Sequence, residues 1–154
     1  MMEWVLRYPA RFLRERAEFD ELAKEKWLKA LDWRLESGSI EGDVDMEIFG
    51  ITYATTLTYP ELFPETRAYI RPRDRSQQWS NHQYGPGGSL CLEWRADNWD
   101  SRTTGADLVR SAFKLLASER NPNEPVRVPS AHQLSSGQTV RTNEYRLVFR
   151  LKVK

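Results

Sequence analysis

The sequence predicts an α+β domain, in which an amphipathic helix is followed by an antiparallel meander of about four strands and then by a second helix. Three patterns carry this prediction. Apolar side chains recur at helical spacing in residues 10–26, alternate with acidic side chains between Asp43 and Ile48, and return to helical spacing after Thr104. At 154 residues the chain is expected to form one domain over residues 1–154.

The first predicted helix follows Pro9, a residue that is tolerated at a helix start. Its apolar face is formed by Phe12, Phe19, Leu22 and Ala23. Four strands are then expected in turn. The first carries Trp27, Leu31, Trp33 and Leu35 and ends at the turn of residues 37–39, the second carries Val44, Met46 and Ile48, the third covers residues 51–58 after Gly50, and the fourth covers residues 67–71.

Residues 72–90 read as a long polar loop, a type of segment that is usually functional or mobile. Thr104 is a candidate N-cap for the second helix, whose apolar stripe consists of Leu108, Val109, Ala112, Phe113 and Leu116. Residues 121–143 look irregular. The end of the chain, residues 145–153, is predicted to be a strand with alternate side chains buried, because apolar side chains occupy every second position: Tyr145, Leu147, Phe149, Leu151 and Val153.

Charge and composition exclude several classes of function. Lys and Arg number 23 against 22 Asp and Glu, so no basic field predicts nucleic-acid binding. Cys91 is the only cysteine and there are two histidines, so we expect no disulfide framework, no metal and no cofactor. No apolar run approaches the ~20 residues of a membrane span, and no signal-peptide pattern opens the chain. A cytoplasmic protein is expected.

Cys91 stands out because of the segment before it. Gly85, Pro86, Gly87 and Gly88 are incompatible with a regular helix or central strand running up to the cysteine. The ordinary interpretation is that residues 90–92 form a short buried apolar run, since a free cysteine is among the most buried residue types. A thiol that follows such a loop could instead lie in a shallow surface groove. The residues that follow favour this second interpretation.

Four motifs, in the right order, resemble those of ubiquitin-conjugating enzymes, and together they cover roughly residues 10–126. An aromatic-Pro-x-x-aromatic-Pro run spans residues 59–64, Cys-Leu-Glu spans residues 91–93, and Trp99 follows the cysteine by eight residues. The helix that opens at Thr104 ends in two leucines, and residues 121–125 read Asn-Pro-Asn-Glu-Pro. The resemblance implies a ubiquitin-conjugating-like fold with an active-site loop and a crossover helix.

Two departures from the family pattern indicate which subgroup of the family the chain resembles. The family's His-Pro-Asn triplet is replaced by Asn81, His82 and Gln83, and the predicted C-terminal strand takes the place of the family's terminal helices. In both respects the chain is similar to bacterial ubiquitin-conjugating-like proteins, which are encoded beside a ubiquitin-like modifier and its activating enzyme. The implied partners are this modifier, the activating enzyme and a target protein, in a setting such as bacterial antiphage defence, with no nucleic acid and no membrane.

The resemblance implies that Cys91 carries the modifier as a thioester and passes it to an amine of the target. Asn81 or His82 could donate to the oxyanion, and Gln83 occupies the family's asparagine position. Glu124 matches the acidic residue that orients the incoming lysine, although it could equally be an exposed turn glutamate. His132 lies beyond the resemblance, and it could act as a base or donor or be purely structural.

Two other functions compete with conjugation. A catalytically silent ubiquitin-conjugating-like module would bind a modifier or partner through its surface, but such modules typically lack the cysteine. A cysteine hydrolase would need a histidine positioned as a base, and no hydrolase motif surrounds Cys91. Trp99 is expected to pack against the loop after the cysteine and to fix the backbone that carries the thiol.

Overall fold

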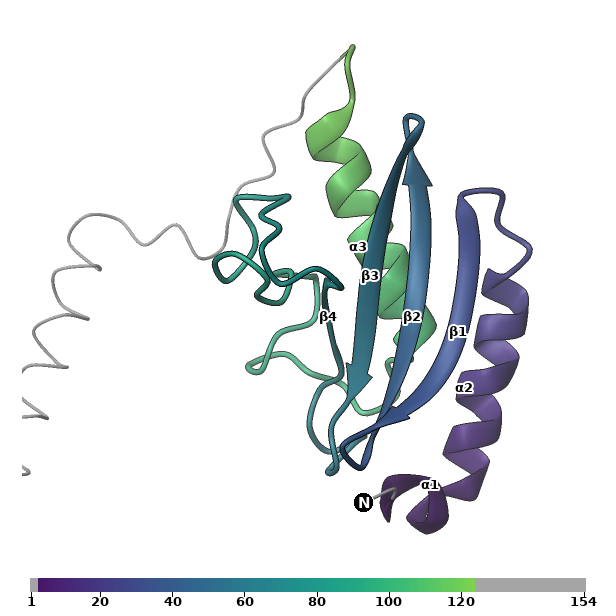
Figure 1. The fold of residues 1–154 in the computed structure, drawn as a ribbon. Helices are drawn as coiled ribbons and strands as arrows, with labels where there is room; N and C mark the ends of the chain where they lie inside the picture. The colour runs from purple at the N-terminus through teal and green to yellow at the C-terminus, as the bar shows by residue number, and fades with distance from the viewer. Residues whose placement is uncertain (1–2, 124–154) are drawn as a thin grey trace, which may run out of the picture.

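The computed structural model describes residues 3–123 of the chain (Figure 1). It shows an α+β arrangement with helices at the N-terminus and a four-stranded antiparallel sheet, as the sequence predicts. The elements are α1 (Glu3–Arg7), α2 (Pro9–Leu22), β1 (Leu28–Glu36), β2 (Ser39–Ile48), β3 (Ile51–Tyr59), β4 (Tyr69–Pro72) and α3 (Gly105–Arg120). The predicted C-terminal strand, Glu124 and His132 lie outside the described residues.

The sheet is a simple meander in which each strand pairs with its neighbours in sequence, in the order β1-β2-β3-β4. Both turns that flank β2 contain two residues, since Glu36 pairs with Ser39 and Ile48 with Ile51. The first turn has φ of 49° and 83° at residues 37 and 38, and the second has 49° and 77° at residues 49 and 50. Positive φ at both positions matches the right-handed twist of a hairpin, and a glycine takes the second position in each case.

Alternation along the strands gives the sheet one apolar and one polar face. Val44 and Met46 are fully buried on the inner face, opposite Leu31 of β1 and Tyr53 of β3, as the register and alternation place them. Helices α2 and α3 pack together and cover this inner face, with α3 behind the sheet and α2 beside β1 (Figure 1). The apolar stripe of α3 is part of this core, and its Phe113 stacks on Trp27 with ring centroids 4.2 Å apart.

The outer face of the sheet carries a network of ion pairs. The carboxylates of Glu41, Asp43 and Asp45 project from β2, and arginines from both sides neutralise them. Arg34 of β1 contacts Glu41 and lies 3.1 Å from Asp43. From the β4 side, Arg71 lies 3.4 Å from Glu41 and Arg73 lies 2.7 Å from Asp45. The acidic residues that alternate with the apolar ones in β2 are therefore paired on this face.

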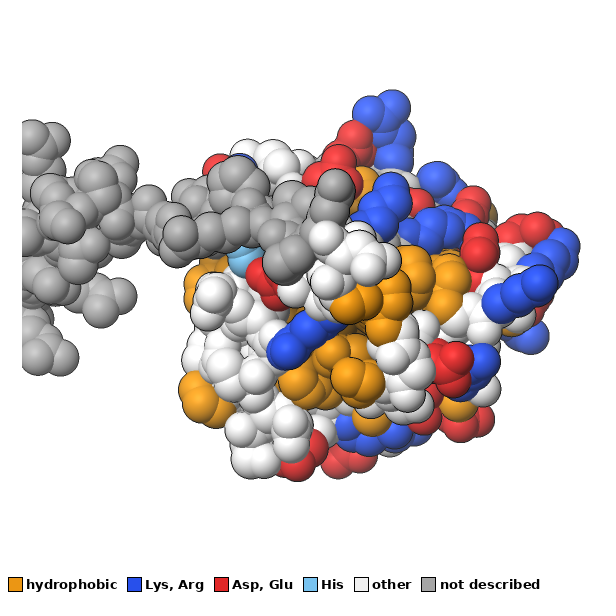
Figure 2. Space-filling model, turned by 90° about the horizontal axis from the view of Figure 1, so that it is seen from above, with side chains coloured by type: hydrophobic (Ala, Val, Ile, Leu, Met, Phe, Trp, Pro, Cys, Tyr) orange, Lys and Arg blue, Asp and Glu red, His pale blue; other side chains and the backbone are white. Residues whose placement is uncertain are grey.

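Seen from the end where α3 finishes, the molecule mixes charges of both signs (Figure 2). Hydrophobic side chains gather near the middle of this end, and Lys, Arg, Asp and Glu side chains lie together on the side of α2 (Figure 2). Phe49 and Ile51, at the turn between β2 and β3, are both more than half exposed. This view of the surface shows no field of a single sign.

A buried glutamate on α2 joins three elements. Glu15 is only 1% exposed, and its Oε2 accepts hydrogen bonds from the Tyr59 hydroxyl at 2.7 Å and from the Gly105 N–H at 2.8 Å. Its Oε1 accepts from Arg11 Nε at 2.7 Å. A β-carbon on Gly105 would lie 1.9 Å from the Tyr59 oxygen, so only glycine fits at this point. The pattern of apolar residues on α2 did not predict this contact.

The ends of several elements differ from the prediction. The predicted helix over residues 10–26 ends at Leu22, because the chain turns there to enter β1. A short additional helix, α1, precedes it and places Trp4 in the core against Tyr59 and Phe63, with ring centroids 5.4 and 4.9 Å apart. The fourth strand covers residues 69–72 and not 67–71.

Candidate active site

Backbone hydrogen bonds fix the position of Cys91. Leu90 donates its N–H to Ile70 O of β4 at 2.8 Å and forms an isolated antiparallel bridge with Gln83. The Cys91 N–H donates to His82 O at 2.6 Å. Leu90 and Leu92 are buried, whereas Cys91 between them is partly exposed. The apolar run around the cysteine therefore anchors the chain to the core and leaves the thiol accessible.

Three side chains act on the Cys91 thiol. Partial burial raises its pKa, because the thiolate is less well solvated there than in water. A hydrogen bond with the Tyr84 hydroxyl and the positive charges of Arg67 and Arg95 lower the pKa and partly offset this effect. The pKa of Tyr84 is itself raised, first by burial and then by the nearby thiolate charge. The surroundings of the Cys91 thiol thus include three residues that sequence reasoning did not find.

No periodic pattern links these three residues to the cysteine. Tyr84 precedes the Gly-Pro-Gly-Gly run, Arg67 comes from the segment before β4, and Arg95 follows the Cys-Leu-Glu motif. The one available signal was the concentration of Arg and Gly around an exposed cysteine, which is a common setting for a thiol whose ionisation is tuned.

Gln83 holds the loop before the cysteine together. Its side-chain Oε1 accepts from the Trp79 N–H at 3.0 Å, and its Nε2 donates to Gln77 O at 2.8 Å and to Gly85 O at 3.0 Å. An amide nitrogen has two hydrogens, and these two carbonyls use both of them. In this arrangement the residue at the family's asparagine position is structural, and it has no hydrogen left for a bound substrate.

His82 belongs to a cluster that ties the loop to the end of α3. It is buried, with its Nε2 3.8 Å from Glu119 Oε1, and its backbone N–H donates to Ser80 Oγ at 2.8 Å. Ser80 Oγ in turn donates to the same Glu119 oxygen at 3.0 Å. One residue further along α3, Arg120 donates to Trp79 O at 2.7 Å. The last turn of α3 therefore holds the segment that accepts the Cys91 N–H.

The remaining predicted site residues are not brought to the thiol by a described contact. Asn81 lies exposed on the same loop, beside the His82 carbonyl that accepts from Cys91. Glu124 and His132 lie outside the described residues, so their predicted roles stay predictions.

The loop after the cysteine is fastened at two points. The Glu93 N–H lies 3.3 Å from Ser111 Oγ of α3, and Asn98 donates to Glu93 O at 3.0 Å. Trp99 is half-buried and donates its indole N–H to Pro64 O at 2.7 Å, so it joins this loop to the aromatic-Pro motif. Both loops that flank the thiol are therefore held by specific hydrogen bonds.

A cavity of about 550 Å³ lies between the loop after the cysteine and the turn that follows β3. Trp99 and Ala96 line one side, and Leu62 and Arg67 line the other. Cys91 is not among the lining residues, and Arg67 is the residue that belongs both to this lining and to the surroundings of the thiol.

No family model matches this chain, and no curated protein is significantly similar to it in sequence. None of the helices within residues 3–123 is long and apolar enough to cross a membrane. Within the same residues, no group of three His, Cys, Asp or Glu side chains is arranged to hold a metal ion. The resemblance to ubiquitin-conjugating enzymes therefore stays a prediction from the sequence motifs.

Proposed function

We propose that the protein is a ubiquitin-conjugating-like enzyme, in which Cys91 accepts a ubiquitin-like protein from an activating enzyme and transfers it to an amine of a target protein. The observation that carries the proposal is the setting of Cys91. The thiol is partly exposed between two buried leucines, on a loop held by backbone hydrogen bonds, and it contacts a hydroxyl and lies near two guanidinium groups. A structural cysteine would need none of these groups.

The arrangement of the elements supports the same proposal. An N-terminal helix, a four-stranded meander, an irregular loop with the cysteine and a helix behind the sheet follow in the order that the sequence resemblance implies. Trp99 joins the aromatic-Pro motif to the cysteine loop, so two of the four motifs meet in space. We therefore assign the chain to the ubiquitin-conjugating-like fold as part of this proposal.

The first step is thioester exchange. The Cys91 thiolate attacks the carbonyl carbon of the modifier's C-terminal thioester, a new S–C bond forms, and the activating enzyme leaves as a thiolate. Only the ionised thiol is nucleophilic, so the positive charges of Arg67 and Arg95 favour this step by favouring the thiolate. Such an exchange needs a reduced thiol, which fits a protein of the reducing cytoplasm.

The second step is aminolysis. A target amine attacks the thioester carbon, a C–N bond forms, the S–C bond breaks, and Cys91 leaves as a thiolate while the amine loses a proton to a base. The tetrahedral intermediate carries an oxyanion that needs a hydrogen-bond donor. The Tyr84 hydroxyl already forms a hydrogen bond with the sulfur and is well placed to donate to the oxyanion. The side-chain amide of Gln83 cannot donate, because both of its hydrogens are bonded to backbone carbonyls. Asn81 is exposed on the same loop and is the second candidate donor.

The proposal is tested by thioester formation. The protein is incubated with its modifier, the activating enzyme and ATP, and the mixture is separated on a gel without reductant. We expect an adduct that thiol treatment removes and that Cys91→Ala never forms. Cys91→Ser is the matched variant, because its hydroxyl can hold the modifier as an ester that survives thiol treatment.

Two results would contradict the proposal. One is the absence of any thiol-sensitive adduct, which would favour a silent binding module. The other is an adduct that persists in Cys91→Ala, which would place the chemistry elsewhere. Tyr84→Phe keeps the ring and removes the hydroxyl, so it should slow thioester formation, because the hydroxyl stabilises the attacking thiolate, and discharge onto an amine as well.

A further inference from the structure

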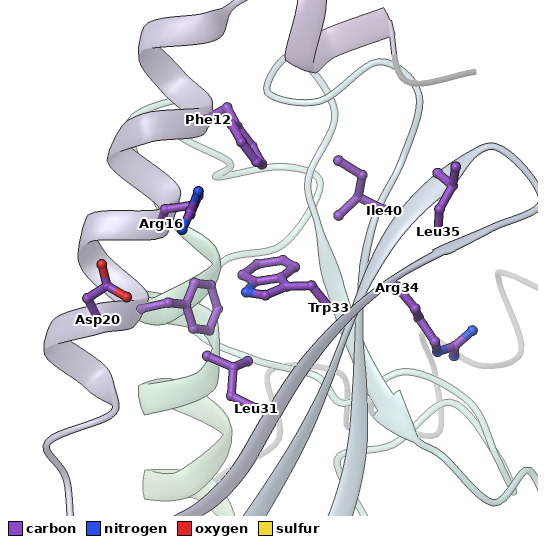
Figure 3. Close-up of a pocket in the computed structure, with 9 residues that line it drawn as sticks. Phe12, Arg16, Asp20, Leu31, Trp33, Arg34, Leu35 and Ile40 are labelled. Carbon is purple, nitrogen blue, oxygen red and sulfur yellow. The ribbon is translucent and has the colours of Figure 1, made fainter.

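An open apolar cavity lies between α2 and β1, on the inner side of the sheet (Figure 3). Its volume is about 540 Å³, and it is lined mainly by apolar side chains of α2 and the sheet, with Arg16 and Asp20 of α2 also among the lining residues. Phe12, Leu31 and Trp33 point into the gap, whereas Arg34 points away toward the other face of β1 (Figure 3). The cavity is separate from the Cys91 loop and is not used by the proposed chemistry.

The strand that borders this cavity has a free edge. β1 is the first strand of the order β1-β2-β3-β4, and within residues 3–123 no other strand pairs with its second edge. Two apolar side chains of β1 also remain uncovered, since Trp33 is 40% exposed and Leu35 is 58% exposed. Soluble proteins usually cover such an edge or protect it with charge, because it can pair with any extended chain.

The opposite face of the same strands is rich in carboxylates. β1 and β2 present six carboxylates there, and those of β2 are paired with Arg71 and Arg73 from the β4 side and with Lys29. Arg34 already pairs with Glu36, Glu41 and Asp43, and Asp32 makes no ion pair within the described residues. A strand added beside β1 would therefore meet apolar side chains on one face and, on the other, a row of β1 in which Asp32 and Glu36 outnumber Arg34.

Residues 145–153 have the composition that matches both faces. They number nine, as does β1, and their alternate positions are apolar from Tyr145 to Val153. The positions between carry Arg146, Val148, Arg150 and Lys152, so three of these four residues are basic and none is acidic. In a paired strand the two rows would point to opposite faces of the sheet.

The chain is long enough to reach the free edge. Residues 124–144 separate the end of the described structure from this segment, and 21 extended residues span at most about 70 Å. A domain of about 120 residues has a radius of gyration of only about 14 Å. The length therefore allows the segment to reach any edge of the sheet.

We propose that residues 145–153 add to the free edge of β1 as a fifth strand of the sheet. The apolar row closes the cavity over Trp33 and Leu35, and the basic row faces Asp32 and the other carboxylates of the outer face. The occupant of the cavity is thus a segment of the same chain, and this inference does not depend on the proposed enzymatic function.

Hydrogen exchange of the full-length protein tests the inference. Amides of β1 should exchange slowly in the wild type and at least about tenfold faster in Leu147→Lys/Phe149→Lys/Leu151→Lys, because the strand that pairs with them is lost. Amides of β3, an interior strand, serve as the internal control and should change far less. Unchanged exchange of β1 in this variant overturns the proposal.

A spin label gives a second readout that leaves the apolar row intact. Val148→Cys is introduced in a Cys91→Ser background and labelled, and the NMR signals of β1 and β4 are compared. Broadening of residues 29–35 and not of residues 69–72 supports the proposal. Broadening that arises only between a labelled molecule and a separate isotope-labelled molecule would identify a second copy as the occupant and overturn it, as would no broadening of β1.

Discussion

At the scale of single residues, the pKa of the Cys91 thiol results from opposing effects. Partial burial raises the pKa of the thiol, and this is the largest effect. The Tyr84 hydroxyl and the charges of Arg67 and Arg95 act in the opposite direction. At neutral pH the thiol is therefore mainly protonated, and its reactivity depends on the groups that stabilise the small thiolate fraction.

The pH dependence of Cys91 alkylation should report how burial and the neighbouring charges together set the pKa of the thiol. The rate with iodoacetamide is expected to rise with pH, with a midpoint above the pKa of about 8.5 of an ordinary cysteine. Arg67→Gln removes a charge that lowers the pKa, so the midpoint should move up and the rate at pH 7 should fall. Arg102→Gln is the matched control, because Arg102 is exposed and pairs with Asp100. A midpoint that stays in place in Arg67→Gln would contradict the assignment.

His82 is expected to act through structure and not through proton transfer. It is buried at the end of α3, where Ser80 and Glu119 hold it and its loop. His82→Ala should therefore destabilise the protein by about 1–3 kcal/mol, measured by thermal melting. The intrinsic rate of Cys91 alkylation should change much less.

A matched variant separates the two roles. Glu119→Gln keeps the shape of the side chain but removes the charge next to Ser80 and His82, so it should destabilise the same loop. Unchanged melting of His82→Ala together with a large loss of amine discharge would show instead that the histidine takes part in the chemistry.

At the scale of elements, the fold depends on how α2, β3 and α3 meet at Glu15. The carboxylate accepts from the hydroxyl of Tyr59 and from the first N–H of α3, where the helix dipole favours negative charge. Burial, and then the carboxylate of Glu15, raise the pKa of Tyr59 well above its usual value, so its hydroxyl stays a donor at any physiological pH.

Removing this carboxylate should be costly. Glu15→Ala leaves the Arg11 charge and the Gly105 N–H without their partner, so we expect a loss of about 3–5 kcal/mol in the free energy of unfolding. Glu18→Ala on the same helix is the control, because its carboxylate is partly exposed and lies 3.8 Å from Arg110. Denaturant titration compares the two. An equal loss of unfolding free energy in both variants would show that Glu15 does not hold α2, β3 and α3 together.

The elements that could be predicted are those set by local signals. Thr104 begins α3 with a capping box, in which Thr104 and Asp107 each satisfy the other's backbone N–H, and this motif can be read directly from the sequence. The second strand followed from strict alternation. The end of α2 at Leu22 could not be predicted, because residues 23–26 are ordinary helix formers and only the connection to β1 stops the helix.

The candidate site likewise contains features that the sequence predicted and features that it could not predict. The glycine-rich segment allowed an accessible thiol and the motifs after it favoured one, and Cys91 is partly exposed. The residues around it come from separate segments, so their approach depends on tertiary structure that no spacing reveals. Glu15 did leave a signal: a charged residue at helical spacing between Phe12 and Phe19 must face the core, and it must therefore have partners there.

At the scale of the whole molecule, the sheet separates two kinds of stabilisation. Its inner face is covered by α2 and α3 and contributes through apolar burial. Its outer face contributes through ion pairs between β2 and the arginines of β1 and β4, which salt weakens where they are exposed. The two loops that flank Cys91 lie beyond the edge of this sheet at β4, and they are held by hydrogen bonds and by the buried side chains of Leu90 and Leu92.

The last turn of α3 has a mechanical consequence. Glu119 and Arg120 form hydrogen bonds with the segment that precedes Cys91. Residues 121–123 lead directly from them into the rest of the chain. A pull on the chain beyond Asn123 therefore enters the folded part at the residues that hold the thiol loop. Tension applied there would act on the hydrogen bonds that hold the Cys91 loop before it acted on the strands, so the position of the sulfur would respond to force on the chain.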